Sequence, residues 1–166
     1  SIDSLAHGES DSPPEKKFYG RKQRAEDVVA VMNQENIEKA HFIGYSMGGW
    51  ICCCLAEFYP NRLQTLIIGG HCPETGTGEE ISGDASKTMY AADFLRDPKI
   101  SSQIKLKKMS DGMKHCFDLL EDVYGHEKAC ANAGVPVLIW KGKGETWICK
   151  KGEIVAKRNR FDFLSV

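Results

Sequence analysis

The stretch Gly44-Tyr45-Ser46-Met47-Gly48-Gly49 decides the fold of this chain. It is a G-x-S-x-G motif between an apolar run over residues 40–45, which predicts a strand, and an apolar segment over residues 47–58, which predicts a buried helix. A serine at a sharp strand-to-helix turn is held outward, with its hydroxyl exposed at the carboxyl end of the sheet. Glycines suit such a turn because a Cβ would hinder its backbone angles and close approaches. The sequence therefore predicts that Ser46 is a nucleophile.

Strand and helix patterns alternate along most of the chain. Apolar residues at i, i+3, i+4 and i+7 predict a helix over residues 18–36. Continuous apolar runs over residues 63–68 and 135–140 predict buried parallel strands. A helix over residues 146–157 and a strand over residues 160–166 complete the pattern. Strands that alternate with helices predict an α/β fold, with a mostly parallel sheet and helices on both faces.

Between the two buried runs the composition changes. No further strand is predicted there, and residues 87–96 and 111–124 have helical patterns. We therefore expect residues 71–133 to form a helical cap insertion. Residues 1–70 and 134–166 are expected to form the core domain.

The charge balance excludes some classes of partner. The chain has 22 Lys plus Arg against 23 Asp plus Glu, so nothing favours binding to nucleic acid or to a membrane surface. No apolar stretch is long enough to span a membrane. We expect a cytoplasmic protein that acts on a small-molecule substrate, and the sequence says nothing about its oligomeric state.

The seven cysteines form neither a C-x-x-C pair nor a zinc-finger spacing with histidine. Cys52, Cys53 and Cys54 are consecutive and cannot share one face of a helix. We interpret the cysteines as small core residues in a reducing compartment, and we expect no metal and no cofactor.

Three stretches resemble the α/β-hydrolase fold family, and together they cover nearly the whole chain. Residues 3–10 resemble the family's D-x-x-G-H-G-x-S loop after the fourth strand, with Ala6 where glycine is usual. Residues 44–49 resemble the nucleophile elbow after the fifth strand. Residues 136–145 resemble the P-x-L-x-x-x-G-x-x-D segment after the seventh strand, with Glu145 in the position of the acid.

The resemblance implies a catalytic role for each of these positions. Ser46 would attack a carbonyl, and Glu145 would orient the histidine that acts as its base. The backbone N–H of Met47 would supply one donor of the oxyanion hole. Tyr45, beside the turn, and His71, after the next strand, are the candidate substrate-pocket residues. Such chemistry needs no cofactor.

The catalytic histidine of the family lies after the acid, just beyond the eighth strand. No histidine follows Glu145 in this chain, and the last one is His126. We therefore expect an inactive fragment of a longer hydrolase, truncated at both ends, with the base beyond Val166. We expect structural roles for the histidines that are present: His7, His41, His71, His115 and His126.

Three functions stay open. The first is a serine hydrolase that cleaves a small-molecule ester, thioester or C–C substrate through an acyl-enzyme. Ser46 argues against the haloalkane dehalogenase and epoxide hydrolase branches, which resemble this family but use an aspartate there. The second is an acyltransferase or perhydrolase with the same triad, and the third is a non-catalytic binding protein of the same fold.

Overall fold

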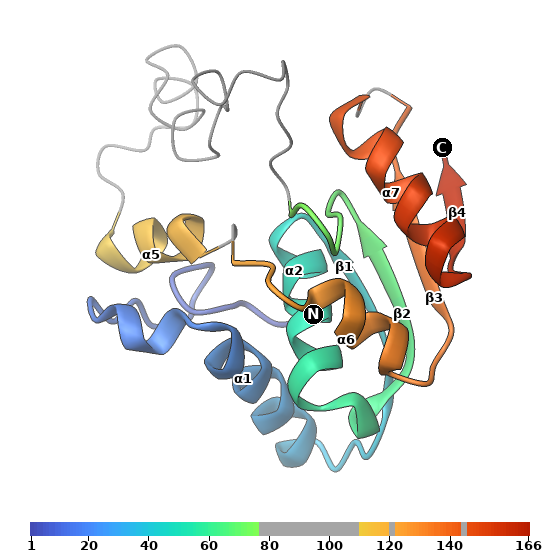
Figure 1. Ribbon diagram of the computed structural model, residues 1–166. Helices are drawn as coiled ribbons and strands as arrows, with labels where there is room; N and C mark the ends of the chain where they lie inside the picture. Colours follow the sequence, from blue (N-terminus) through green and yellow to red (C-terminus); the bar gives the residue numbers. More distant parts are fainter. Residues whose placement is uncertain (77–109, 120–121, 144–145) are drawn as a thin grey trace.

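A parallel sheet forms the centre of the molecule. The computed structural model describes residues 1–76, 110–119, 122–143 and 146–166. Within them, the strands pair in parallel in the order β1-β2-β3-β4, which is also their order along the chain (Figure 1). Their bounds are Ala40–Tyr45 for β1, Leu63–Gly69 for β2, Val137–Lys141 for β3 and Asp162–Ser165 for β4.

Helices follow the strands along the chain and confirm the predicted α/β fold. Helix α2 packs on β1 and β2, and α7 packs on β3 and β4. The helices are α1 (Arg21–Gln34), α2 (Met47–Phe58), α5 (Asp111–Leu119), α6 (His126–Asn132) and α7 (Thr146–Asn159), with short 3-10 turns η1 (Lys16–Tyr19) and η2 (Pro60–Arg62).

The strand register brings the carboxyl ends of the strands to one edge. Tyr45, the last residue of β1, pairs with Gly69 of β2, and Gly69 pairs with Trp140 of β3. Lys141 in turn pairs with Ser165 of β4. The residues that follow each strand therefore meet at the same edge of the sheet, where ligands bind in open α/β folds.

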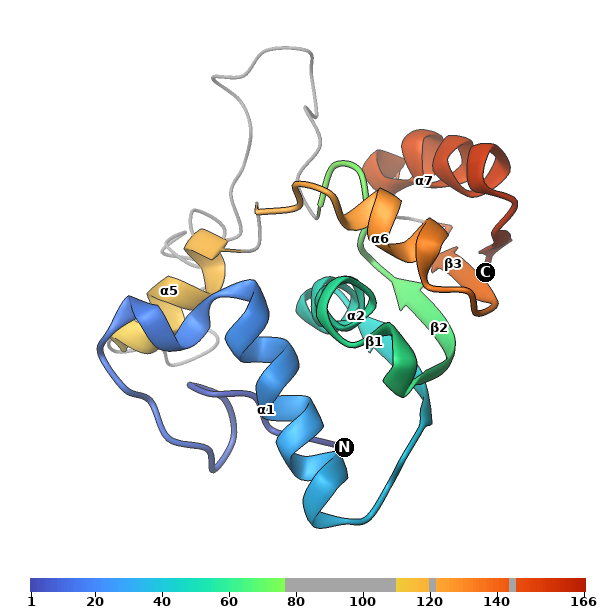
Figure 2. The same ribbon diagram turned by 60° about the horizontal axis from the view of Figure 1, so that its bottom comes forward.

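Helices at both ends of the sheet cover the same face. Val137 and Ile139 lie two residues apart on β3 and so point to the same side. Val137 packs in the cluster built by α1 and α2, whereas Ile139 packs with Val155 of α7. Figure 2 shows α1, α2, α6 and α7 arranged on this side.

The opposite face carries exposed apolar side chains. Ile43 is 73%, Tyr45 54% and Leu164 47% exposed. The alternation of strands with helices along the sequence predicts helices on both faces of the sheet. Among the residues that the structure describes, no helix packs on this second face.

Helix α2 is apolar on all sides because it is surrounded. It contacts α1, α6, β1 and β2 (Figure 2). Cys52, Cys53 and Cys54 are therefore all buried although they point in three directions. The Trp50 indole is buried beside them and donates from Nε1 to the Asp122 carbonyl at 2.9 Å. Each large apolar side chain buried here contributes about 1.5–3 kcal/mol.

The predicted elements agree with the structure in the core, where β3, α7 and β4 were all predicted, and differ in the region of α5 and α6. The strand over 40–45 and the helix over 47–58 have the predicted bounds. The helix predicted over 111–124 ends at Leu119, and α6 was not predicted. The helix predicted over 87–96 lies outside the described residues, and the division into core and cap stays a prediction.

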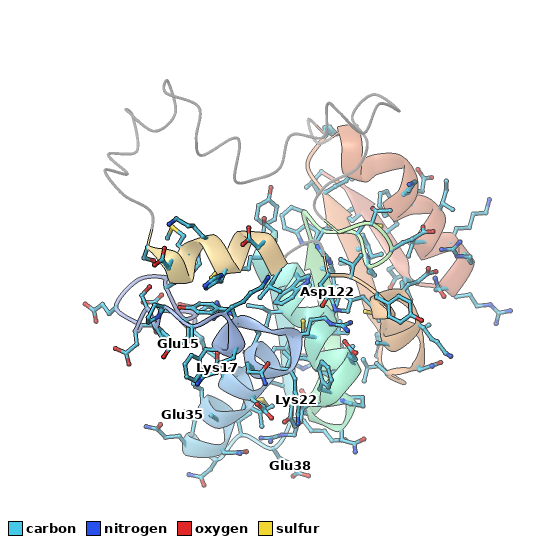
Figure 3. All side chains as sticks on the ribbon, turned by 60° about the vertical axis from the view of Figure 1, so that its left-hand side comes forward. Glu15, Lys17, Lys22, Glu35, Glu38 and Asp122 are labelled. Carbon is cyan, nitrogen blue, oxygen red and sulfur yellow. The ribbon has the colours of Figure 1, made fainter. Side chains whose placement is uncertain are left out.

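The segment that follows α1 carries acidic side chains. Figure 3 shows Glu35 and Glu38 extending outward where the chain leaves this helix for β1. None of the described helices is long and apolar enough to cross a membrane.

Candidate active site

Ser46 lies between β1 and α2 in a sterically unfavourable backbone conformation. Its φ is 54° and its ψ is −115°, while Tyr45 ends the strand and Met47 begins the helix. A non-glycine residue held at such angles costs about 1–3 kcal/mol and persists only where the surroundings impose it. This geometry confirms the predicted strand–turn–helix arrangement.

Two backbone hydrogen bonds hold the turn in place. The Ser46 N–H donates to the Gly69 carbonyl of β2 at 2.8 Å. The Ser46 carbonyl accepts from the Trp50 N–H at 3.1 Å, which is the first bond of α2. The serine is therefore fastened to the neighbouring strand and to its own helix.

Two glycines of the motif are required sterically, and one is not. A Cβ on Gly44 would lie 2.1 Å from the Gly48 carbonyl oxygen. A Cβ on Gly49 would lie 2.8 Å from the Cβ of His71. A Cβ on Gly48 would meet no atom within 4 Å. Gly44 and Gly49 thus allow the strand, the helix and the end of β2 to approach closely.

The hydroxyl of Ser46 has no structural role among the residues that the structure describes. The side chain is half-buried, does not cap α2, and makes no hydrogen bond to another described residue. Met47 is the first residue of α2, so its N–H has no partner within the helix and lies at the positive end of the helix dipole. A serine hydroxyl and an N–H group at a helix N-terminus are therefore adjacent at this edge.

Tyr45 lies on the exposed face of the sheet, beside the turn. Its ring is 5.5 Å from the ring of Trp140, centroid to centroid, at a tilt of 32°. It also covers Gly70, where φ is 59° and a Cβ would lie 2.7 Å from the Tyr45 ring. The structure thus brings Tyr45 to the predicted edge as part of an aromatic pair.

His71 follows β2 as predicted, but its side chain is fully buried. Neither ring nitrogen has a hydrogen-bond partner among the described residues. Burial, and then the neighbouring His126, lower the pKa of His71 to about 3, and burial lowers the pKa of His126 to about 4. Both imidazoles are therefore neutral at neutral pH.

Glu145 lies outside the described residues, so its assignment as the acid stays a prediction. The chain just before it is placed at the edge that carries Ser46. There β3 ends at Lys141, and the Lys143 N–H donates to the Val166 carbonyl at 2.6 Å.

The histidines have other partners than Ser46. His41 lies near the start of β1, at the opposite edge, with Nδ1 2.9 Å from the Thr65 hydroxyl. A ring nitrogen of His7 lies 3.2 Å from the Leu5 carbonyl. His115 similarly contacts the Pro14 carbonyl at 3.0 Å.

Sequence reasoning missed one cluster of reactive side chains. Cys53, His71 and His126 are all buried and each places a potential ligand atom within 4.8 Å of the other two. They come from α2, the end of β2 and the start of α6. A histidine directly after a buried strand was the only local signal, because the cluster arises from tertiary packing.

Comparisons with known proteins agree with this geometry. A family model described as "alpha/beta hydrolase fold" matches residues 1–100. The chain is 35% identical over 97 residues to the putative 2-succinyl-6-hydroxy-2,4-cyclohexadiene-1-carboxylate synthase of Bacillus subtilis (strain 168). The aligned region covers 58% of this chain and 35% of that protein. It is 33% identical over 66 residues to bifunctional epoxide hydrolase 2 of Sus scrofa, and this region covers 40% of this chain and 12% of that protein. The chain thus spans 35% or less of the length of these two relatives.

Solved structures match over almost the whole chain. A hydrolase from Pseudomonas aeruginosa PA01 superposes with a TM-score of 0.71 at 22% identity, covering 99% of this chain and 69% of that one. The enol-lactonase from Burkholderia xenovorans LB400 gives a TM-score of 0.67 at 19% identity, and the match covers 99% of this chain and 70% of that one. At these identities the likeness shows a shared fold.

Proposed function

The chain belongs to the α/β-hydrolase fold family, and we propose that it carries the nucleophile of a serine hydrolase. Its substrate would be a small-molecule ester, thioester or C–C compound. The observation that carries the proposal is Ser46 itself, at φ 54° and ψ −115° between β1 and α2. This strained position holds the hydroxyl at the edge of the sheet where substrates bind in open α/β folds.

In this proposal the Ser46 oxygen attacks the substrate carbonyl and forms an acyl-enzyme. The Met47 N–H donates to the developing oxyanion, a contribution of about 10²–10³ in kcat for one such donor. An imidazole takes the serine proton and passes it to the leaving group, and Glu145 orients that imidazole. Water then releases the acyl group. The described contacts of the histidines do not supply this imidazole.

The substrate class is supported by the named activities of similar proteins. Structures with this fold include an enol-lactonase, an enzyme that degrades N-acyl homoserine lactone, and carboxylesterases. A serine at residue 46, where epoxide hydrolases use an aspartate, favours acyl chemistry over epoxide opening.

Hydrolysis of p-nitrophenyl butyrate tests the proposal, in the 166-residue chain and in a longer protein that contains it. We expect negligible turnover by the chain alone and turnover by the longer protein. In the longer protein Ser46→Ala should reduce kcat by up to ~10⁶. Ser165→Ala is the matched control, because Ser165 is an exposed serine at the same edge of the sheet, and it should leave kcat unchanged. Equal rates in Ser46→Ala and the unchanged protein would contradict the proposal.

A non-catalytic binding protein is the second candidate. It is favoured by one observation, namely that no described side chain hydrogen-bonds the Ser46 hydroxyl. A fluorophosphonate probe separates the two candidates, because it labels a serine only when that serine is activated. Labelling at Ser46 in the longer protein supports the hydrolase, and ester binding without labelling supports the binding protein.

Acyl transfer is tested by adding an alcohol acceptor to the p-nitrophenyl butyrate assay, where it would form a new ester product.

A further inference from the structure

The core behind the nucleophile helix contains a set of metal-ligating groups. Cys53, His71 and His126 are fully buried, and their ligand atoms all lie within 4.8 Å of one another. Around a tetrahedral zinc ion, sulfur and nitrogen ligands stand roughly 3.3–3.8 Å apart, given bond lengths of about 2.0–2.3 Å. Shifts of about 1 Å or less would therefore bring the three groups around one ion.

The imidazole of His71 has no other use in the described structure. Both of its ring nitrogens are buried and lack a hydrogen-bond partner among the described residues. An unsatisfied buried polar atom costs about 1–3 kcal/mol, so two such atoms on one ring need a compensating interaction. Gly49 makes room for this side chain, since a Cβ there would lie 2.8 Å from the His71 Cβ.

His126 is arranged in the manner of a metal-bound imidazole. Its Nδ1 is buried and has no partner among the described residues, which leaves that atom available as a ligand. On the other side of the ring, Nε2 lies 3.7 Å from the Sγ atom of Cys54 and 3.8 Å from a carboxylate oxygen of Glu57. Metal-ligating histidines commonly direct their second nitrogen toward a carboxylate, which orients the ring.

A candidate fourth ligand lies beside Cys53. The Sγ atom of Cys130, on α6, is 3.7 Å from the Sγ atom of Cys53. This is the separation expected for two thiolates on one zinc ion. Two thiolates also neutralise the charge of Zn²⁺, which matters because an uncompensated charge is costly in a buried site.

We propose that Cys53, Cys130, His71 and His126 bind a structural zinc ion. The two thiols release their protons to solvent when the metal binds, and the four ligands complete a tetrahedral Cys2His2 set. The ion joins α2, the end of β2 and α6, so it fixes α6 against the helix that carries Ser46. Nothing in this proposal depends on catalysis by Ser46.

The test uses the full chain, produced in zinc-supplemented medium and purified with a phosphine reductant and no chelator. Metal content is measured by mass spectrometry. We expect about one zinc per chain, and a loss of about 90% or more of it in Cys53→Ser and in His71→Gln. Cys72→Ser is the matched control, because Cys72 is equally buried but packs in a separate cluster with Ile139, and it should keep its zinc.

A second measurement covers variants that do not fold. The unchanged chain is refolded with Co²⁺, and thiolate ligation is read from the charge-transfer absorbance of a tetrahedral cobalt site. Absence of this absorbance would overturn the proposal. So would zinc content in the unchanged chain no higher than in Cys53→Ser, or equal loss of zinc in Cys72→Ser.

Discussion

Gly44 of β1 lies directly against the backbone of Gly48 in α2, so that a Cβ on Gly44 would come within 2.1 Å of the Gly48 carbonyl oxygen. No side-chain rearrangement can relieve this overlap because the obstacle is backbone. The contact sets how closely the helix approaches the strand that it follows. It therefore fixes the angle of the turn that holds Ser46.

This contact predicts opposite effects for two similar substitutions. Gly44→Ala should lower the free energy of unfolding by about 3 kcal/mol or more, because strand and helix must separate. Gly48→Ala should raise it by about 0.5–1 kcal/mol, since its Cβ meets no atom and alanine favours the helix. Urea denaturation of both variants measures the difference. Equal effects would show that the overlap does not constrain the turn.

The strained backbone at Ser46 predicts that replacing this serine by glycine makes the fold more stable while removing the proposed nucleophile. Ser46→Gly should raise the free energy of unfolding by about 1–2 kcal/mol, because glycine adopts a positive φ without a Cβ clash. Ser46→Ala keeps the Cβ and should not show this gain. Asn36→Gly is the control for the backbone effect, since Asn36 also has a positive φ of 56° but lies before β1. If Ser46→Gly and Ser46→Ala are equally stable, the turn carries no strain.

The contacts of Arg21 predict that this residue contributes more to stability than its neighbour Lys22 does. Its guanidinium lies 3.0 Å from Glu57 and 3.2 Å from Asp122, and donates to the Tyr124 carbonyl at 2.6 Å. Burial raises the pKa of Glu57, and the Arg21 charge opposes that rise. Arg21→Met removes the partner of this half-buried carboxylate and should cost about 1–3 kcal/mol.

Lys22→Met supplies the matched control for Arg21. Lys22 is an exposed residue on the same helix (Figure 3) and pairs with Glu26 at 3.6 Å. Such surface pairs contribute about 0.3–0.5 kcal/mol, so the change in urea midpoint should be small. A loss in Arg21→Met no greater than in Lys22→Met would contradict the network.

The two buried histidines predict how stability depends on pH in chelator-treated protein. An unfolded histidine binds a proton near pH 6.5, whereas burial lowers the pKa of His126 to about 4 and that of His71 to about 3. Below pH 6.5 the unfolded state therefore binds more protons, and stability falls as the pH falls. Each histidine should remove about 1.4 kcal/mol per pH unit in this range.

Urea titrations between about pH 6.5 and 5 report on these histidines, because this range lies above the ordinary pKa of carboxylates. Burial raises the pKa of Glu57 and of Asp27, which acts in the opposite direction on stability, so the comparison between variants identifies the histidine contribution. His126→Gln should reduce the slope by about half. His41→Gln, which changes an exposed histidine, should not change it. A slope in His126→Gln equal to that of the unchanged protein would show that His126 is not the group responsible.

The elbow could be predicted from sequence because its determinants are local. The strand before Ser46, the glycines around it and the apolar helix after it lie within twenty residues, and each has a pattern of its own. The structure reproduces both element bounds. The elbow is also one of the three stretches on which the family resemblance is based.

The segment after residue 110 was less predictable because tertiary contacts decide it. Apolar residues continue at helical spacing to Val123, which suggested one long helix, yet α5 ends at Leu119 and a new helix begins at His126. Helix α6 has seven residues and is stabilised by packing on α2 rather than by its own propensity. The cluster of Cys53, His71 and His126 arises from the same packing, so no spacing in the sequence predicted it.

The one-sided arrangement of the described helices affects how the folded state responds to hydrophobic dyes. Anilinonaphthalene sulfonate is widely used to detect loosened, partly folded proteins through their exposed apolar surface. Here the native sheet itself presents such a surface at Ile43, Tyr45 and Leu164. The dye should therefore fluoresce with the intact fold as well as with a loosened one. Near-ultraviolet circular dichroism of the three tryptophans, of which Trp50 is buried, reports native packing without that ambiguity.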